Sequence, residues 1–123
     1  MSTRTRSDTE CITRLVNSKK YIFHPDSPNQ LLEALRTLEA AIQTAYVLGH
    51  TPEQGEDIYR ILVNGEYIVG FDLQKNTSPV VLQNVKKYSI PEYQKQISGG
   101  SSRRHLDTAL KLSMEDMEVS RRG

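Results

Sequence analysis

The pair Asn64-Gly65 most constrains the fold of this chain, because it separates two runs that read as β-strands. Residues 57–63 and 66–73 are rich in Ile, Val, Tyr and Phe and contain no proline. Asn and Gly both accept the positive φ that a two-residue type I′ turn needs at its two central positions. The sequence therefore predicts an antiparallel hairpin closed by this turn.

A two-residue turn also fixes how the two strands pair, because a slip of one residue would exchange their faces. Val63 is expected opposite Glu66. The pairs expected on one face are Leu62/Tyr67, Arg60/Val69 and Ile58/Phe71, and those on the other are Ile61/Ile68 and Tyr59/Gly70. Both faces carry apolar side chains, so we expect the hairpin at the centre of a sheet.

Two further segments have the composition of strands. Residues 79–85 add a third antiparallel strand after a turn at 75–77. Residues 20–24 form a candidate fourth strand, which Pro25 ends.

One long helix is predicted between these strands, and one short helix is predicted at each end of them. The long helix begins at its cap, Ser27, and stops at Gly49; its apolar stripe is Leu31, Leu35, Leu38, Ile42 and Ala45. Short helices are predicted at 8–17 and 90–97, the second opened by a capping box at Ser89.

These elements define an α+β fold: a three-stranded antiparallel meander with a candidate fourth strand, packed by one long helix. A C-terminal helix follows a Gly/Ser linker. The predicted organisation is a disordered tail at 1–7, an α+β domain at 8–97, a linker at 98–102 and an amphipathic interaction helix at 103–119.

Composition narrows the class of protein. The 123 residues suit one modest core, and 16 Lys and Arg against 15 Asp and Glu leave a net charge of +1, which gives no global field for nucleic acid or an anionic membrane. Cys11 is the only cysteine, so no intramolecular disulfide can form. With no apolar run of membrane length and a polar N-terminus, we expect a soluble intracellular protein, cytoplasmic or nuclear.

The C-terminal helix carries the clearest functional pattern. Leu106, Ala109, Ser113 and Asp116 are spaced three, four and three residues apart, so they share one helical face. This pattern resembles a ubiquitin-interacting motif. The resemblance implies that Ala109 and Ser113 contact ubiquitin's apolar patch, that Asp116 meets its basic rim, and that Leu110 adds apolar area.

The sequence alone does not decide what this helical face contacts. The motif normally has an acidic run before its apolar residue, whereas this chain has Arg103 and Arg104. Basic residues in the first turn and acids in the last oppose the helix dipole, so the isolated helix is expected to be marginal. The same stripe also suits docking on the chain's own domain, or on another protein partner.

A second reading concerns Arg60, Lys86, Lys87 and Tyr88, which form a basic cluster with a phenol. The element order resembles the RelE/ParE class of toxins, some of which cleave RNA with basic residues and a tyrosine near such positions. That resemblance implies a catalytic role for these four residues and RNA as the partner. The favoured function is instead non-enzymatic protein binding, with ubiquitin as the candidate partner.

No other catalytic or ligand-binding pattern stands out. The three histidines are isolated in sequence, so neither a metal site nor a cofactor is expected. Cys11 has no neighbouring base in the sequence, and we expect it to be non-catalytic.

Overall fold

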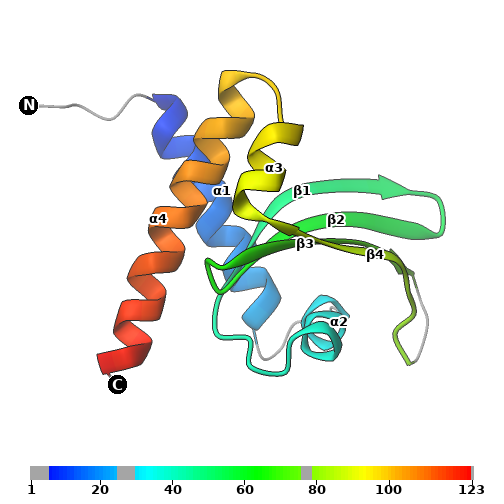
Figure 1. Cartoon of the computed structure of the whole chain (residues 1–123). Helices are drawn as coiled ribbons and strands as arrows, with labels where there is room; N and C mark the ends of the chain where they lie inside the picture. The colour runs from blue at the N-terminus through cyan, green and yellow to red at the C-terminus, as the bar shows by residue number, and fades with distance from the viewer. Residues whose placement is uncertain (1–5, 25–29, 76–78, 123) are drawn as a thin grey trace, which may run out of the picture.

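The chain folds in the order α-α-β-β-β-β-α-α, with one antiparallel sheet between helices (Figure 1). This computed structural model describes residues 6–24, 30–75 and 79–122. The elements are α1 (Arg6–Phe23), α2 (Leu31–Leu38), β1 (Ala45–Glu53), β2 (Glu56–Val63), β3 (Tyr67–Gln74), β4 (Leu82–Ser89), α3 (Ile90–Gln96) and α4 (Gly100–Arg122). The α+β class with an antiparallel sheet and a C-terminal helix is confirmed.

The predicted hairpin turn is present, but the strands pair one residue out of the predicted register. Asn64 and Gly65 have φ of +53° and +68°, and the Glu66 N–H donates to the Val63 carbonyl at 2.9 Å. Val63 nevertheless pairs with Tyr67, since Glu66 adds one residue to the loop. The expected pairing of Val63 with Glu66 is therefore wrong.

The observed register separates the two faces of the hairpin more cleanly than the predicted one. Tyr59/Phe71, Ile61/Val69 and Val63/Tyr67 are paired on one face, while Leu62/Ile68 and Arg60/Gly70 are paired on the other. Arg60 therefore lies opposite Gly70 and not Val69.

Two predicted elements are wrong because tertiary packing overrides the local pattern. The candidate strand at 20–24 falls largely in α1, where Ile22 is two helical turns from Leu15 and both are fully buried. The long helix ends at Leu38, and its predicted last turns form β1 instead. Ala45 and Tyr46, next to each other in β1, are buried in different clusters, because successive side chains of a strand point to opposite faces of the sheet.

The other segments match the sequence more closely. The predicted third strand is β4, shifted to Leu82–Ser89. The capping box of α3 is confirmed, because the Ser89 hydroxyl accepts from the Glu92 N–H at 3.2 Å and the Ser89 N–H donates to the Glu92 carboxylate at 3.1 Å. Ser27, the predicted cap of the long helix, and most of the 75–77 turn lie outside the described residues.

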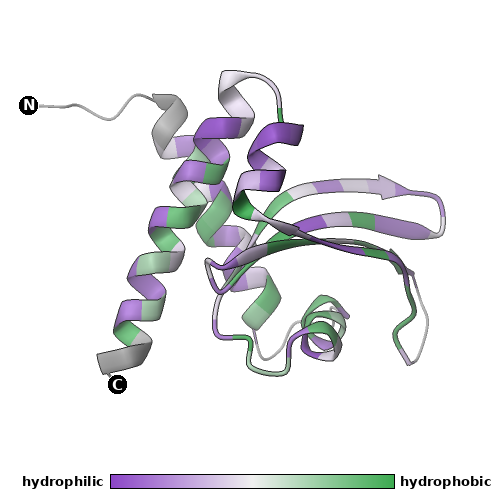
Figure 2. Cartoon of the chain, in the orientation of Figure 1, coloured by the Kyte–Doolittle hydropathy of each residue, from purple (hydrophilic) through white to green (hydrophobic). Residues whose placement is uncertain are grey.

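Each face of the sheet has its own apolar core, and Figure 2 shows the green apolar positions gathered between the sheet and the helices. The α2 side contains Ile22, Leu31, Ala34, Leu35, Ala45, Tyr59, Ile61, Val63, Val69, Phe71 and Leu73. The opposite side, under α1, α3 and α4, contains Leu15, Tyr46, Leu62, Ile68, Tyr93, Leu106 and Ala109. Helix α1 contributes to both.

Helix α4 is part of the second core. It begins at Gly100, inside the predicted 98–102 linker, directly after Gly99 with its φ of +89°. Leu106, Ala109 and Ser113 are at most 1% exposed. The C-terminal helix is therefore docked on the chain's own domain, which is one of the alternatives that the sequence left open. Within the described ranges, no helix combines the length and apolarity needed to cross a membrane.

The close contact between α4 and the hairpin turn predicts the effect of Gly65→Ala on stability. A Cβ at Gly65 would lie 3.0 Å from the Cβ of Ser113, on a residue whose φ is already positive. We expect a loss of about 1 kcal/mol from backbone strain and about 1–3 kcal/mol more from overpacking, measured by urea unfolding.

Gly55→Ala is the matched control. Gly55 also has positive φ, +89°, but no atom lies within 4 Å of its added Cβ. The Gly55→Ala variant should therefore lose only the stability that backbone strain costs. Equal losses in the two variants would contradict the packing of α4 on the β2–β3 turn.

Candidate functional site

The residues predicted to bind ubiquitin are brought together by α4, on the face that packs against the chain's own domain. Leu106 and Ala109 join the core formed by α1, α3 and the sheet, and Leu110 is partly buried beside it. Ala109 is 0% exposed, and its small side chain lets α4 approach the rest of this core closely. The surface that it contacts in the docked helix is therefore intramolecular.

Ser113 lies against the backbone of the β2–β3 turn. Its side chain is fully buried at Gly65, and its hydroxyl has no hydrogen-bond partner among the described residues. A buried hydroxyl without a partner is unfavourable. Ser113 therefore acts here as a small packing residue.

Asp116 ends this inner face with a polar cluster. Its Oδ2 accepts from the Thr44 hydroxyl at 2.7 Å and from the Tyr46 hydroxyl at 2.5 Å, and its Oδ1 lies 3.0 Å from the Lys19 ammonium. Partial burial acts to raise the pKa of Asp116, but these three donors outweigh it and hold the pKa below its usual range. Burial first, and then the bond to Asp116, raise the pKa of Tyr46 well above its ordinary value.

The basic cluster of the second reading is partly assembled. Arg60, Gly70 and Lys86 are direct neighbours across β2, β3 and β4. Gly70 has no side chain, so its neighbours can pack over its backbone. A Cβ added at Gly70 would lie 3.6 Å from the Tyr88 ring and 3.9 Å from the Arg60 side chain. Lys87 lies on the opposite face, with its ammonium 5.0 Å from the centre of the Tyr67 ring. We call Arg60, Lys86 and Tyr88 the sheet cluster.

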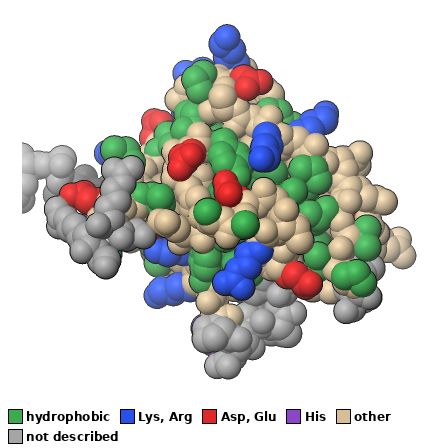
Figure 3. All heavy atoms as spheres, turned by 60° about the horizontal axis from the view of Figure 1, so that its bottom comes forward, with side chains coloured by type: hydrophobic (Ala, Val, Ile, Leu, Met, Phe, Trp, Pro, Cys, Tyr) green, Lys and Arg blue, Asp and Glu red, His purple; other side chains and the backbone are tan. Residues whose placement is uncertain are grey.

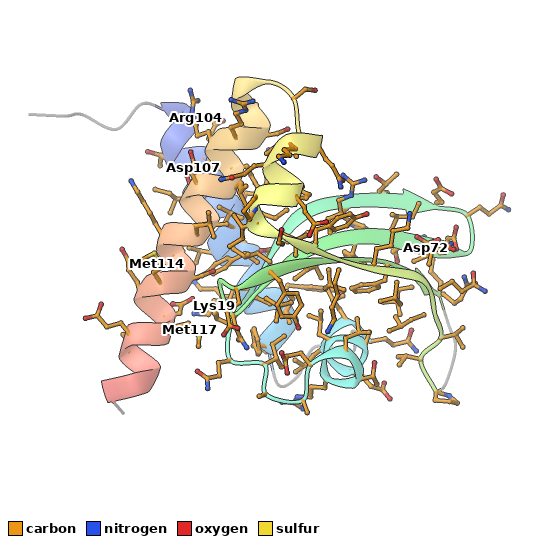
Figure 4. All side chains as sticks on the ribbon, in the orientation of Figure 1. Lys19, Asp72, Arg104, Asp107, Met114 and Met117 are labelled. Carbon is orange, nitrogen blue, oxygen red and sulfur yellow. The ribbon has the colours of Figure 1, made fainter. Side chains whose placement is uncertain are left out.

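A groove lies beside the C-terminal half of α4, where Met114 and Met117 are labelled (Figure 4). It is about 690 Å³ in volume and is lined by Asn64, Gly65, Glu66, Lys111, Met114, Glu115, Met117 and Glu118. Met114 is 69% exposed. We call this the α4 groove.

A second hollow, the β1 hollow, lies between the N-terminal turns of α4 and the sheet edge. Its volume is about 440 Å³, and its lining is Arg14, Ser18, Val47, Leu48, Gly49, His50, Tyr93, Ser101, Ser102, His105 and Leu106. His105 also reaches Cys11, whose sulfur is 3.5 Å from its Nδ1. Sequence spacing does not indicate this pair, because 94 residues separate its members.

Metal-binding geometry is not found in the described parts of the chain, where no three His, Cys, Asp or Glu side chains gather into a candidate site. Comparison of this chain with protein-family models, curated proteins and solved structures found no match.

The Asp116 cluster predicts a component of stability that depends on pH. Asp116→Asn keeps the size of the side chain but removes its charge from three donors, so we expect a loss of about 1–3 kcal/mol at neutral pH. Because the folded pKa is lowered, this stabilisation is complete above the carboxyl's unfolded pKa of about 3.9 and is lost as pH falls through the folded pKa.

Urea unfolding over the acid range measures both effects, and Asp107→Asn, on the exposed side of the same helix, is the control. The parent and Asp107→Asn should lose stability towards low pH more steeply than Asp116→Asn. The same loss of stability towards low pH in all three proteins would contradict the role of Asp116.

Proposed function

We propose that this protein is a non-enzymatic protein-binding module that receives its partner in the α4 groove, with ubiquitin as the candidate partner. The observation that carries the proposal is the exposed Met114 beside Met117 in an open groove. Thioether side chains are flexible and polarizable, and they are common at surfaces that bind other proteins. An exposed large apolar side chain next to a hollow is typical of an interaction site.

The charges at the groove point to the chemistry of the partner. Glu66, Glu115 and Glu118 contribute three negative charges to the lining, and Lys111 contributes one positive charge. An apolar patch bordered by basic side chains complements this surface. The ubiquitin-interacting motif has the same preference for an apolar patch with a basic rim.

The proposed contact differs from that of the motif. Ala109 and Ser113 are 0% exposed, so a partner could reach them only after α4 detached from the sheet. Detachment would expose the fully buried Leu106, and burying a leucine contributes about 1.5–3 kcal/mol. The surface already open to a partner is the Met114 side of the same helix. In Figure 3, apolar side chains and charges of both signs share the face turned forward.

Titration of ¹⁵N-labelled ubiquitin with the full chain tests the proposal. Met114→Lys removes the exposed apolar contact and adds a charge that repels a basic rim, so we expect chemical-shift changes with the parent and none with this variant. Met114 is largely exposed, and the thermal midpoint should stay close to that of the parent.

Ser113→Ala separates the two ways of binding. The buried Ser113 hydroxyl has no hydrogen-bond partner among the described residues, so binding in the α4 groove should survive and stability should be equal or higher. Binding lost in Ser113→Ala and retained in Met114→Lys would indicate the detached motif instead. An unchanged ubiquitin spectrum with the parent would reject ubiquitin as the partner.

A second candidate function, RNA binding or cleavage in the manner of a RelE-like toxin, is favoured by one observation. Arg60 and Lys86 flank Gly70 on one face, with Tyr88 packed over it, so two cations and a ring lie together. Cations that contact phosphates and a ring that stacks on bases are the elements of single-strand recognition.

Anisotropy and cleavage assays with single-stranded RNA test this candidate. Lys86→Ala should weaken binding several-fold and reduce its salt dependence, whereas Lys87→Ala, on the opposite face, should not. Equal effects of the two substitutions would show that the sheet cluster is not the site.

A further inference from the structure

Cys11 and His105 form a thiol–imidazole pair between two helices. Cys11 comes from α1 and His105 from α4, and Sγ lies 3.5 Å from Nδ1. This distance is within reach of an S–H···N hydrogen bond. A thiol next to an imidazole is the arrangement in which a cysteine becomes a nucleophile, because the ring can accept its proton.

The other nitrogen of the ring determines which tautomer faces the thiol. Nε2 lies 3.4 Å from the Val47 carbonyl oxygen, which can only accept, so Nε2 carries the proton. Nδ1 is then left with a lone pair towards Cys11. Burial, the largest influence, lowers the pKa of His105; the bond to Val47 acts to raise it, and the nearby Arg14 acts to lower it, so the net direction is downward. The ring is therefore neutral at pH 7 and available as a base.

The surroundings suit a small anionic reagent. Cys11 is partly exposed, and His105 lines the β1 hollow together with Arg14, Ser101 and Ser102. Arg14 follows Cys11 by three residues on α1, so both lie on neighbouring turns of one side of the helix. The lining of this hollow includes no Asp or Glu. An anion bound next to Arg14 is thus adjacent to the pair.

We propose that Cys11 is a reactive thiol, activated by His105, that exchanges with anionic low-molecular-mass disulfides. The thiol proton moves to Nδ1, and the thiolate attacks one sulfur of the disulfide. A mixed disulfide forms on Cys11 as the S–S bond of the reagent breaks. The leaving thiolate takes the proton from the imidazolium, so Cys11 is oxidised and the departing sulfur is reduced. His105 returns to its neutral form.

Because Cys11 is the only cysteine, any thiol reaction of the full chain reports on it alone. The probe is dithiobis(nitrobenzoate), an anionic aromatic disulfide whose released thiolate absorbs visible light; with this probe the imidazolium passes its proton to solvent. At neutral pH we expect His105→Gln to react about tenfold more slowly than the parent or more slowly still. His50→Gln, which changes another histidine of the β1 hollow, should react like the parent.

Two results would overturn the activation by His105. One is that His105→Gln reacts as fast as the parent or faster. This result would count against the activation even if the faster reaction came from looser packing around Cys11. The other is a slower rate that stays slower at alkaline pH, where hydroxide removes the thiol proton and a lost base no longer matters. The titratable and charged groups that act on the ring are Cys11 and Arg14 from α1, and Tyr93 from α3 lines the same hollow. The ring of His50, from β1, instead stacks on Tyr59 and bonds to Asp57.

Arg14→Gln tests the preference for an anion. It should slow the reaction with dithiobis(nitrobenzoate) several-fold and leave the reaction with neutral dithiodipyridine unchanged. Equal effects on both reagents would overturn the anionic preference. Comparable thermal midpoints of parent and variants confirm that each protein is folded.

Discussion

The tertiary structure depends on one buried amide, the side chain of Asn64 in the β2–β3 turn. Its Oδ1 accepts from the N–H groups of Gln43 and Thr44 at 2.7 and 3.1 Å, and its Nδ2 donates to the Ala41 carbonyl at 3.2 Å. The Asn64 N–H donates to the Thr44 carbonyl at 2.8 Å. These bonds hold the segment that leads into β1 against the turn, and so place β1 beside β2. Asn64 as a residue is 8% exposed, so leaving these groups unpaired would be costly.

The same turn positions α4. Ser113 of α4 packs against Gly65, the residue after Asn64. Thr44, whose N–H donates to Asn64, also donates its hydroxyl hydrogen to Asp116 of α4. Helix α4 is thereby held at two points by the segment that Asn64 organises. The inner face of the helix serves the chain's own core, and its Met114 side is the surface on which we base the proposed protein binding. The N-terminal half of α4 brings His105 to Cys11, on which the proposed thiol chemistry depends.

Local signals in the sequence were sufficient where the structure depends on neighbouring residues. The positive φ of Asn64 and Gly65 and the capping box of Ser89 and Glu92 are present as predicted, because each needs only residues within a few positions. The register was missed by one residue because nothing local shows that Glu66 joins the loop. That one residue brings Arg60 opposite Gly70, and thereby gives the sheet cluster its geometry. The stripe from Leu31 to Ala45 was read as one helix because apolar spacing alone does not show where a helix stops and a buried strand begins.

The sequence by itself determined the α+β class, the central hairpin and the single face shared by Leu106, Ala109, Ser113 and Asp116. Those features follow from backbone preferences and from the repeat of the helix, which are properties of short segments. Only the tertiary structure decided what that face contacts, because an apolar stripe fits its own domain as well as a partner. It also decided which distant residues meet, namely Cys11 with His105 and Asp116 with Thr44 and Tyr46. Such pairs leave no trace in sequence spacing, since they depend on how α1, α4 and the sheet pack together.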